Sequence, residues 1–164
     1  MPEIDDRFLE EKMFSAKEIF DLAVKIEENG ERFYRNALTG ISDTRLRDLF
    51  GWLADEEVKH REWFMKNREK LPAEKSGLSL QEEESAILAS IVGDQTFSLD
   101  EADLSEFHHS EDLIALAQEF EKDTILFFEM IRSAVSDPET LKHLDEIIEE
   151  EHRHIQLLDE CKEK

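Results

Sequence analysis

The 164-residue sequence contains little of what a β-rich or disulfide-bonded protein needs. It has five glycines, three prolines and a single cysteine, Cys161. So few turn-forming residues disfavour a fold of many short strands. A lone cysteine excludes a disulfide within the chain and a thiolate-rich metal site, and it favours a reducing compartment. Because helix-forming residues such as glutamate, lysine, leucine and alanine dominate, we expect an all-α protein. The lone cysteine makes the cytoplasm the expected compartment.

Long hydrophobic runs are also missing. No stretch approaches the ~18 apolar residues of a membrane span, and residues 1–7 lack the apolar core of a signal peptide. The formal net charge is −22, from 20 basic and 42 acidic residues. Such a charge repels nucleic acid and anionic membranes, so we expect neither as a partner, whereas it attracts cations. A solvated helix surface explains most of the acidic residues. The acidic residues that it does not explain are the ones that bear on function.

Four amphipathic patterns predict four long helices, with apolar positions every three or four residues. Ser15, Ser110 and Pro138 are residues typical of helix starts. The expected helices span about 15–38, 43–70, 111–136 and 138–162. Because the joints within the first and second pairs are short, each pair forms an antiparallel hairpin. A crossover at about 73–110, with a short helix near 79–92, joins the hairpins. We predict an antiparallel four-helix bundle in a single domain, 1–164.

The two hairpins repeat with a single offset. Glu27 corresponds to Glu121, since 121 − 27 = 94. A Glu-x-x-His pair that begins at Glu57 corresponds to one that begins at Glu151, and 151 − 57 is again 94. One register therefore superimposes a lone glutamate on a lone glutamate and a Glu-x-x-His on a Glu-x-x-His, which separate coincidences would not share. The histidines of the two pairs are His60 and His154.

All six of these residues occupy positions that their helices otherwise give to core side chains. For example, Glu57 and His60 continue an inward series that begins with Leu46, Leu49 and Leu53. A buried carboxylate costs several kcal/mol to desolvate, and like charges add to that cost. Since no lysine or arginine shares the inward faces, bound metal is the natural compensation. The sequence therefore predicts a metal site inside the bundle.

The ligand types also indicate which metal binds. Four carboxylates and two imidazoles suit five- or six-coordinate iron or manganese better than tetrahedral zinc. We expect Glu57 and Glu151 to bridge two ions ~3.5–4 Å apart. Glu27 and Glu121 would each bind one ion, and each histidine would complete one ion, as in ferritin-like di-iron proteins. The expected cofactor is two iron ions per chain, with manganese or zinc as substitutes.

Two assignments near the site have alternatives. Glu149 and His152 form another Glu-x-x-His pair, but they lie on a polar face and outside the repeat register. We therefore prefer the pair that begins at Glu151. Tyr34 lies two turns beyond Glu27 on the same face. It is a candidate catalytic residue that hydrogen-bonds a carboxylate or acts as a redox-active phenol, and a core tyrosine is the alternative.

Small and aromatic residues near the site also have two interpretations each. Gly30 and Thr124 occupy matching inward positions one turn beyond the lone glutamates. They either leave space for oxygen, peroxide or water beside the metals, or, for Gly30, allow close helix packing. Trp52 and Trp63 lie beside the inward stripe of the second helix, which predicts a place in the core or in a subunit interface.

Two stretches, residues 27–34 and 49–60, resemble the rubrerythrin branch of the ferritin-like superfamily. The resemblance covers the four helices and implies a ferritin-like fold, a di-iron carboxylate centre that reacts with peroxide or oxygen, and a homodimer or larger assembly. Full rubrerythrins carry a rubredoxin domain with cysteine pairs, which this chain lacks, so an external donor protein such as rubredoxin would supply electrons. Peroxidase-type members share an extra glutamate on the third helix, where this chain has Ala117, Gln118 and Thr124. This departure leaves the choice between peroxide and oxygen open.

The expected function is an oxidoreductase that uses two ferrous ions to reduce peroxide or oxygen. An alternative is an iron-binding ferroxidase or storage protein, in which the same centre oxidises iron on its way elsewhere. A third hypothesis is a metal site that only stabilises the bundle.

Overall fold

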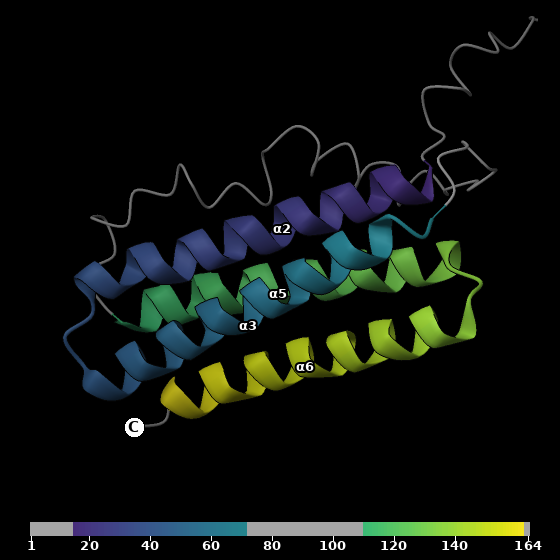
Figure 1. Cartoon of the computed structure of the whole chain (residues 1–164). Coiled ribbons are helices and arrows are strands. Elements are labelled where there is room, and N and C mark those ends of the chain that lie inside the picture. Colours follow the sequence, from purple (N-terminus) through teal and green to yellow (C-terminus); the bar gives the residue numbers. More distant parts are fainter. Residues whose placement is uncertain (1–14, 72–109, 163–164) are drawn as a thin grey trace, which may run out of the picture.

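Four long helices make up the bundle in the computed structural model, which describes residues 15–71 and 110–162. They are α2 (Ala16–Ala37), α3 (Thr44–Arg68), α5 (Ser110–Ala134) and α6 (Pro138–Lys162), and a short turn, η1 (Leu38–Gly40), follows α2. No strand occurs within the described ranges. Two antiparallel hairpins, α2–α3 and α5–α6, connect at opposite ends of the bundle (Figure 1). The predicted all-α antiparallel four-helix bundle is confirmed.

The helix ends follow from local capping. The Ser15 hydroxyl accepts a hydrogen bond from the backbone N–H of Glu18 at 3.1 Å, and the Asp43 carboxylate accepts one from Arg45 at 3.0 Å. Asp137 caps α6 through the N–H of Thr140, also at 3.0 Å. Such bonds satisfy N–H groups that have no partner within the helix. The observed ends differ from the expected ones by two residues at most, and the short helix expected at 79–92 lies outside the described residues.

Two apolar layers enclose the middle of the bundle. On α2 and α3, aromatic residues lie seven positions before and after the inward glutamate, which is two helical turns in either direction. The rings of Phe20 and Phe64 meet at 5.3 Å on one side, and those of Tyr34 and Phe50 meet at 5.1 Å on the other. The corresponding apolar residues of α5 and α6, all almost fully buried, are Ile114, Phe128, Leu144 and Leu158. The polar residues between these layers are therefore shielded from water along the bundle axis.

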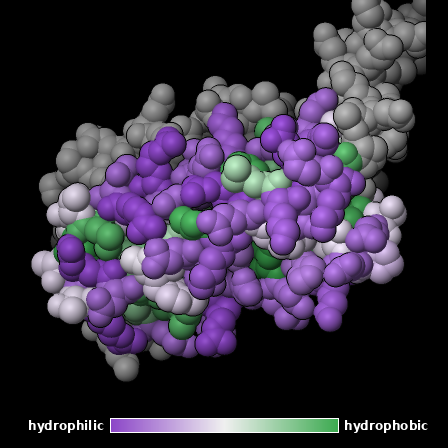
Figure 2. Space-filling model, in the orientation of Figure 1, coloured by the Kyte–Doolittle hydropathy of each residue, from purple (hydrophilic) through white to green (hydrophobic). Residues whose placement is uncertain are grey.

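The outer surface is mainly hydrophilic, as the net charge of −22 requires. Figure 2 shows a face covered by polar residues, with only small, separated hydrophobic areas. Within residues 15–71 and 110–162, no helix combines the length and apolar composition that a membrane crossing needs. In this described part of the chain, three large hydrophobic residues are nevertheless exposed: Trp52, Met65 and Leu126.

Candidate metal centre

The structure brings all six predicted metal-site residues together between the apolar layers. Each is at most 3% exposed. The α2–α3 hairpin contributes the first half-site, and the α5–α6 hairpin contributes the second half-site, each with a lone glutamate and a Glu-x-x-His. The first half-site is Glu27, Glu57 and His60, and the second half-site is Glu121, Glu151 and His154. The shared offset of 94 residues therefore corresponds to two facing halves of one cluster.

Two overlapping groups of ligand atoms exist within the cluster. Each group holds four residues whose ligand atoms all lie within 4.8 Å of one another. The groups are Glu27, Glu57, His60 and Glu151, and Glu57, Glu121, Glu151 and His154. Glu57 and Glu151 belong to both groups, and they are the two carboxylates expected to bridge. The remaining residues divide into one glutamate and one histidine for each group.

Both imidazole rings present Nδ1 to the carboxylates. His60 Nδ1 lies 2.8 Å from a Glu151 oxygen and 3.6 Å from a Glu27 oxygen. His154 Nδ1 lies 3.1 Å from Glu151 and 3.6 Å from Glu121. The rings stack almost in parallel, with centroids 5.8 Å apart. At these distances His60 contacts a glutamate of each hairpin, whereas His154 contacts two glutamates of its own hairpin. Both rings direct Nδ1 into the cluster.

The outer nitrogens of the two rings have different surroundings. His60 Nε2 is 2.6 Å from a carboxylate oxygen of Glu150, whose side chain is 49% exposed. His154 Nε2 is buried and has no hydrogen-bond partner among the described residues. Beside that ring lies the indole of Trp52, in an edge-to-face contact with centroids 5.5 Å apart. A carboxylate that binds the outer nitrogen fixes ring orientation and leaves Nδ1 free for a metal, and only His60 has this support.

The cluster leaves many buried polar atoms without hydrogen bonds, which is rare in folded proteins. Both carboxylate oxygens of Glu27 and of Glu57 lack a partner, as do one oxygen each of Glu121 and Glu151 and Nδ1 of His60. These atoms converge on one region, and their types are those that bind iron or manganese. The residues present therefore fit a two-metal group, because bound cations would satisfy atoms that the protein alone does not.

Burial and mutual repulsion shift the carboxyl pKa values. Burial, followed by the charge of Glu151, raises the pKa of Glu27 and raises that of Glu57 well above its ordinary value. The same causes bring the pKa of Glu121 to about 8. Burial also opposes ionisation of Glu151, but hydrogen bonding with Glu121 and the charge of His60 outweigh it, so the pKa of Glu151 is lowered. Without metal, protons thus occupy places that cations would take.

The pKa values of both histidines are raised. Burial disfavours the charged ring of His154, but the nearby carboxylates of Glu121 and Glu151 overcome this and raise its pKa to about 10. The pKa of His60 rises well above its ordinary value because the charges of Glu151 and Glu27 outweigh burial. Metal binding must therefore displace protons from both rings.

Tyr34 joins the cluster through a hydrogen bond. Its buried hydroxyl donates to a Glu121 oxygen at 2.6 Å, so it links α2 to α5. Burial and then the charge of Glu121 raise the pKa of Tyr34 well above its usual range. Of the interpretations that the sequence allows, the structure shows the hydrogen bond to a carboxylate. Its counterpart in the repeat, Phe128, has no hydroxyl.

The small residues near the lone glutamates do not open a matching pair of spaces. A Cβ added to Gly30 would lie 2.9 Å from the Phe120 ring and 3.3 Å from the Glu57 carboxyl carbon. Gly30 therefore permits the close approach of two neighbouring helices. Thr124 uses its hydroxyl within its own helix, where it donates to the carbonyl of Phe120 at 2.9 Å.

The competing Glu-x-x-His pair lies on the outside of α6. Glu149 and His152 are both exposed, whereas Glu151 and His154 are buried. The prediction missed Glu150 and Trp52 as neighbours of the histidines. Glu150 directly precedes Glu151, so its position one step around the helix was a usable signal for a side chain aimed at α3. No signal in the sequence pointed to the contact between Trp52 and His154.

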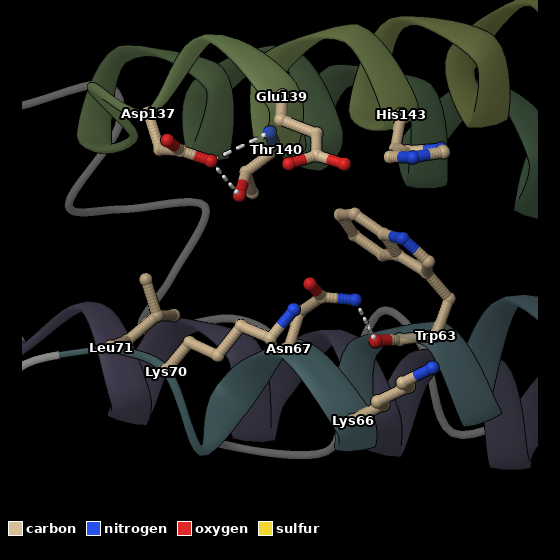
Figure 3. A pocket seen from close by; sticks show the side chains of 9 residues that line it. All are labelled: Trp63, Lys66, Asn67, Lys70, Leu71, Asp137, Glu139, Thr140 and His143. Atoms are coloured by element: carbon tan, nitrogen blue, oxygen red, sulfur yellow. Dashed lines mark hydrogen bonds between the residues drawn. The ribbon is translucent and has the colours of Figure 1, made fainter.

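A separate cavity of about 590 Å³ lies between the end of α3 and the start of α6. Figure 3 shows Trp63 and Asn67 on one side and His143 on the other, with Asp137 bonded to Thr140 at the rim. None of the six cluster residues lines it. Its walls carry lysines as well as acids, so its chemistry differs from that of the cluster.

Comparisons with known proteins identify the family and the fold. The family model for rubrerythrin matches residues 18–162. A Thermotoga maritima protein provisionally named a ferritin-like diiron-carboxylate protein is similar in structure, with a TM-score of 0.66, 22% identity, and coverage of 93% of this chain and 97% of that one. A hypothetical protein from Pyrococcus furiosus has a TM-score of 0.64, 21% identity, and coverage of 92% and 89%. No curated protein matches the chain. The structural likenesses show a ferritin-like fold.

Proposed function

Because this chain belongs to the rubrerythrin family, we propose that it is a di-iron oxidoreductase that reduces peroxide or oxygen with electrons from a separate donor protein. The observation that carries this proposal is the pair of ligand groups that share Glu57 and Glu151. Two ions held by shared carboxylates act on one substrate together, which a single structural ion does not do.

We assign the six cluster residues as the metal ligands. Glu57 and Glu151 would bridge the ions, and Glu27 with His60 and Glu121 with His154 would complete one ion each. Two bound ferrous ions would supply the two electrons that reduction of peroxide requires. None of Ala117, Gln118 and Thr124 supplies a further carboxylate, so we propose that the metal ligands stay the same during the reaction. The Gln118 amide instead faces the Ile155 carbonyl and Asp159 of α6 at 3.3–3.4 Å.

The protein's own residues set the conditions for this chemistry. Tyr34 holds one oxygen of Glu121, so we propose it as a positioning residue for that ligand. Glu150 orients His60 and, being partly exposed, connects that ring to solvent as a route for protons. The aromatic layers keep water out along the bundle axis, which strengthens electrostatic interactions inside the cluster.

The test is anaerobic titration with Fe(II), followed by peroxide or oxygen in separate stopped-flow experiments. We expect two irons per chain and a rise in visible absorption on oxidation, and the faster oxidant identifies the substrate. A reduced donor such as rubredoxin should then reverse the change over repeated cycles.

Other outcomes point elsewhere. Continued iron uptake far beyond two per chain would support the storage alternative. Two irons that never react with either oxidant would support a structural site. A protein that binds neither iron nor manganese would contradict the proposal.

A further inference from the structure

The two histidines of the cluster meet the outside of the protein through different side chains. His60 contacts the carboxylate of Glu150. His154, itself 0% exposed, contacts the indole of Trp52, which is 41% exposed. The indole thus touches solvent on one side and a residue of the candidate metal site on the other. A carboxylate relays protons, whereas an indole has an extended π-system through which electrons pass.

We infer that Trp52 is the residue through which electrons from an external carrier reach the metal centre, by way of His154. This inference rests on the proposed di-iron function. In each step a reduced one-electron carrier protein would give up one electron, and one ferric ion held by the cluster would take it up to become ferrous; two such steps would restore a ferrous pair. No bond forms or breaks at the indole, so the route needs no further reactant.

The other aromatic residues near the cluster lack either exposure to solvent or contact with a cluster residue. Tyr34 contacts Glu121 but is fully buried beneath Phe33 and Phe50. Trp63 has ring contacts with Phe20, Phe64 and His143, none of which belongs to the cluster. Among residues 15–71 and 110–162, Trp52 is the aromatic residue that is both exposed and in ring contact with the site.

Helix packing alone does not require an indole at this position. The residue that matches Trp52 in the repeat, 94 positions later, is Glu146, which is exposed. The same place in the bundle therefore accepts a charged side chain. What distinguishes Trp52 is its ring contact with His154.

The chain contains only two tryptophans, which allows a direct spectroscopic test. In Trp63→Phe the remaining emission comes from Trp52, and in Trp52→Phe it comes from Trp63. Loading with ferric iron should quench the Trp52 emission strongly and the Trp63 emission much less. Zinc loading serves as a control, because zinc accepts no electron. Equal quenching of the two tryptophans by iron would contradict the inference.

The kinetic test measures re-reduction of the oxidised, iron-loaded protein. The variants are Trp52→Leu and Trp52→Phe, with Trp63→Phe as the matched control on the same helix. Reduced rubredoxin is mixed anaerobically with each, and the loss of ferric absorption is followed. We expect Trp52→Leu to slow this step by an order of magnitude or more, Trp52→Phe to slow it less, and Trp63→Phe to leave it unchanged.

Iron content and the oxidation rate of each variant separate failure of the route from failure of the site. Wild-type protein that binds no iron overturns both proposals. A wild type that binds and oxidises iron, with Trp52→Leu re-reduced at the wild-type rate, overturns the Trp52 route alone. If Trp52→Leu fails to retain two irons, Trp52→Phe, which keeps an aromatic ring against His154, decides the matter. A change of association state in either variant with unaltered re-reduction would assign Trp52 to a subunit interface and overturn the route.

Discussion

The α2–α3 and α5–α6 hairpins carry the same ligand types in the same register but surround them differently. His60, on the first hairpin, is held by Glu150, whereas His154, on the second, lies against Trp52. Tyr34 on α2 supports Glu121, and its counterpart Phe128 offers no such bond. The repeated residues therefore build a symmetric frame of six ligand candidates, while the residues around them make the two half-sites chemically unequal. Variants at matched positions can separate the effect of the six repeated residues from the effect of their neighbours.

The largest effect should come from breaking the frame itself. Glu151→Ala removes a carboxylate that belongs to both ligand groups, so we expect iron binding to fall from two ions per chain to none. Glu149→Ala, two residues earlier on the exposed face, should keep both ions. Iron per chain after gel filtration measures this. A Glu151→Ala protein that retains two irons would show that the frame is wrongly assigned.

A smaller effect should come from the carboxylate behind one histidine. Glu150→Gln weakens the acceptor for His60 Nε2, and losses of this kind reduce metal affinity by about 10–100-fold. The matched variant Glu56→Gln should change affinity less, because Glu56 pairs with Lys59 at 2.6 Å. Competition with a chelator gives both affinities. Equal losses would mean that Glu150 contributes no more to metal affinity than Glu56, which also lies near His60.

Packing beside the frame provides the third comparison. Gly30→Ala would push a methyl group into Phe120, an overlap that costs about 1–3 kcal/mol and outweighs the ~1 kcal/mol that alanine gains in a helix. Thr124→Ala, at the matched position, loses only a hydrogen bond within its helix. Urea unfolding of the metal-free proteins should show lower stability for Gly30→Ala. A more stable Gly30→Ala protein would mean that Phe120 moves aside freely.

The smallest effect should follow loss of the Tyr34 hydroxyl. Tyr34→Phe removes one buried hydrogen bond, which typically contributes about 0.5–1.5 kcal/mol to the free energy of unfolding. If Tyr34 only positions Glu121, oxidation of bound iron by peroxide should persist in this variant. Phe128→Tyr serves as the mirror variant. Complete loss of oxidation with two irons still bound would instead indicate a redox role for the phenol.

Most of the fold was predictable because periodicity and capping are local properties of the sequence. Ser15 and Pro138 mark helix boundaries through chemistry visible within a few residues. The end of α3 at Arg68, two residues before the expected position, reflects a tighter final turn in which Lys70 donates to the Asn67 carbonyl. Such fraying depends on geometry that no residue type specifies.

The candidate site was predictable to the extent that the repeat encodes it. The inward register of Glu57 and Glu151 follows from helix geometry, so their burial could be anticipated. The contact of Trp52 with His154 depends on the angle between α3 and α6, which sequence spacing does not contain. Gly30 shows the same limit, since only the structure reveals that Phe120 occupies the space beside it.

Each group of ligand atoms draws on both hairpins: Glu151 reaches into the group of the first half-site, and Glu57 reaches into that of the second. Ions bound there would crosslink the α2–α3 hairpin to the α5–α6 hairpin. Without metal, burial and mutual repulsion raise the pKa values of Glu27, Glu57 and Glu121, so we expect protonated side chains there to join the two hairpins less strongly than bound ions would. We therefore expect the metal-loaded protein to resist proteolysis longer than the metal-free protein.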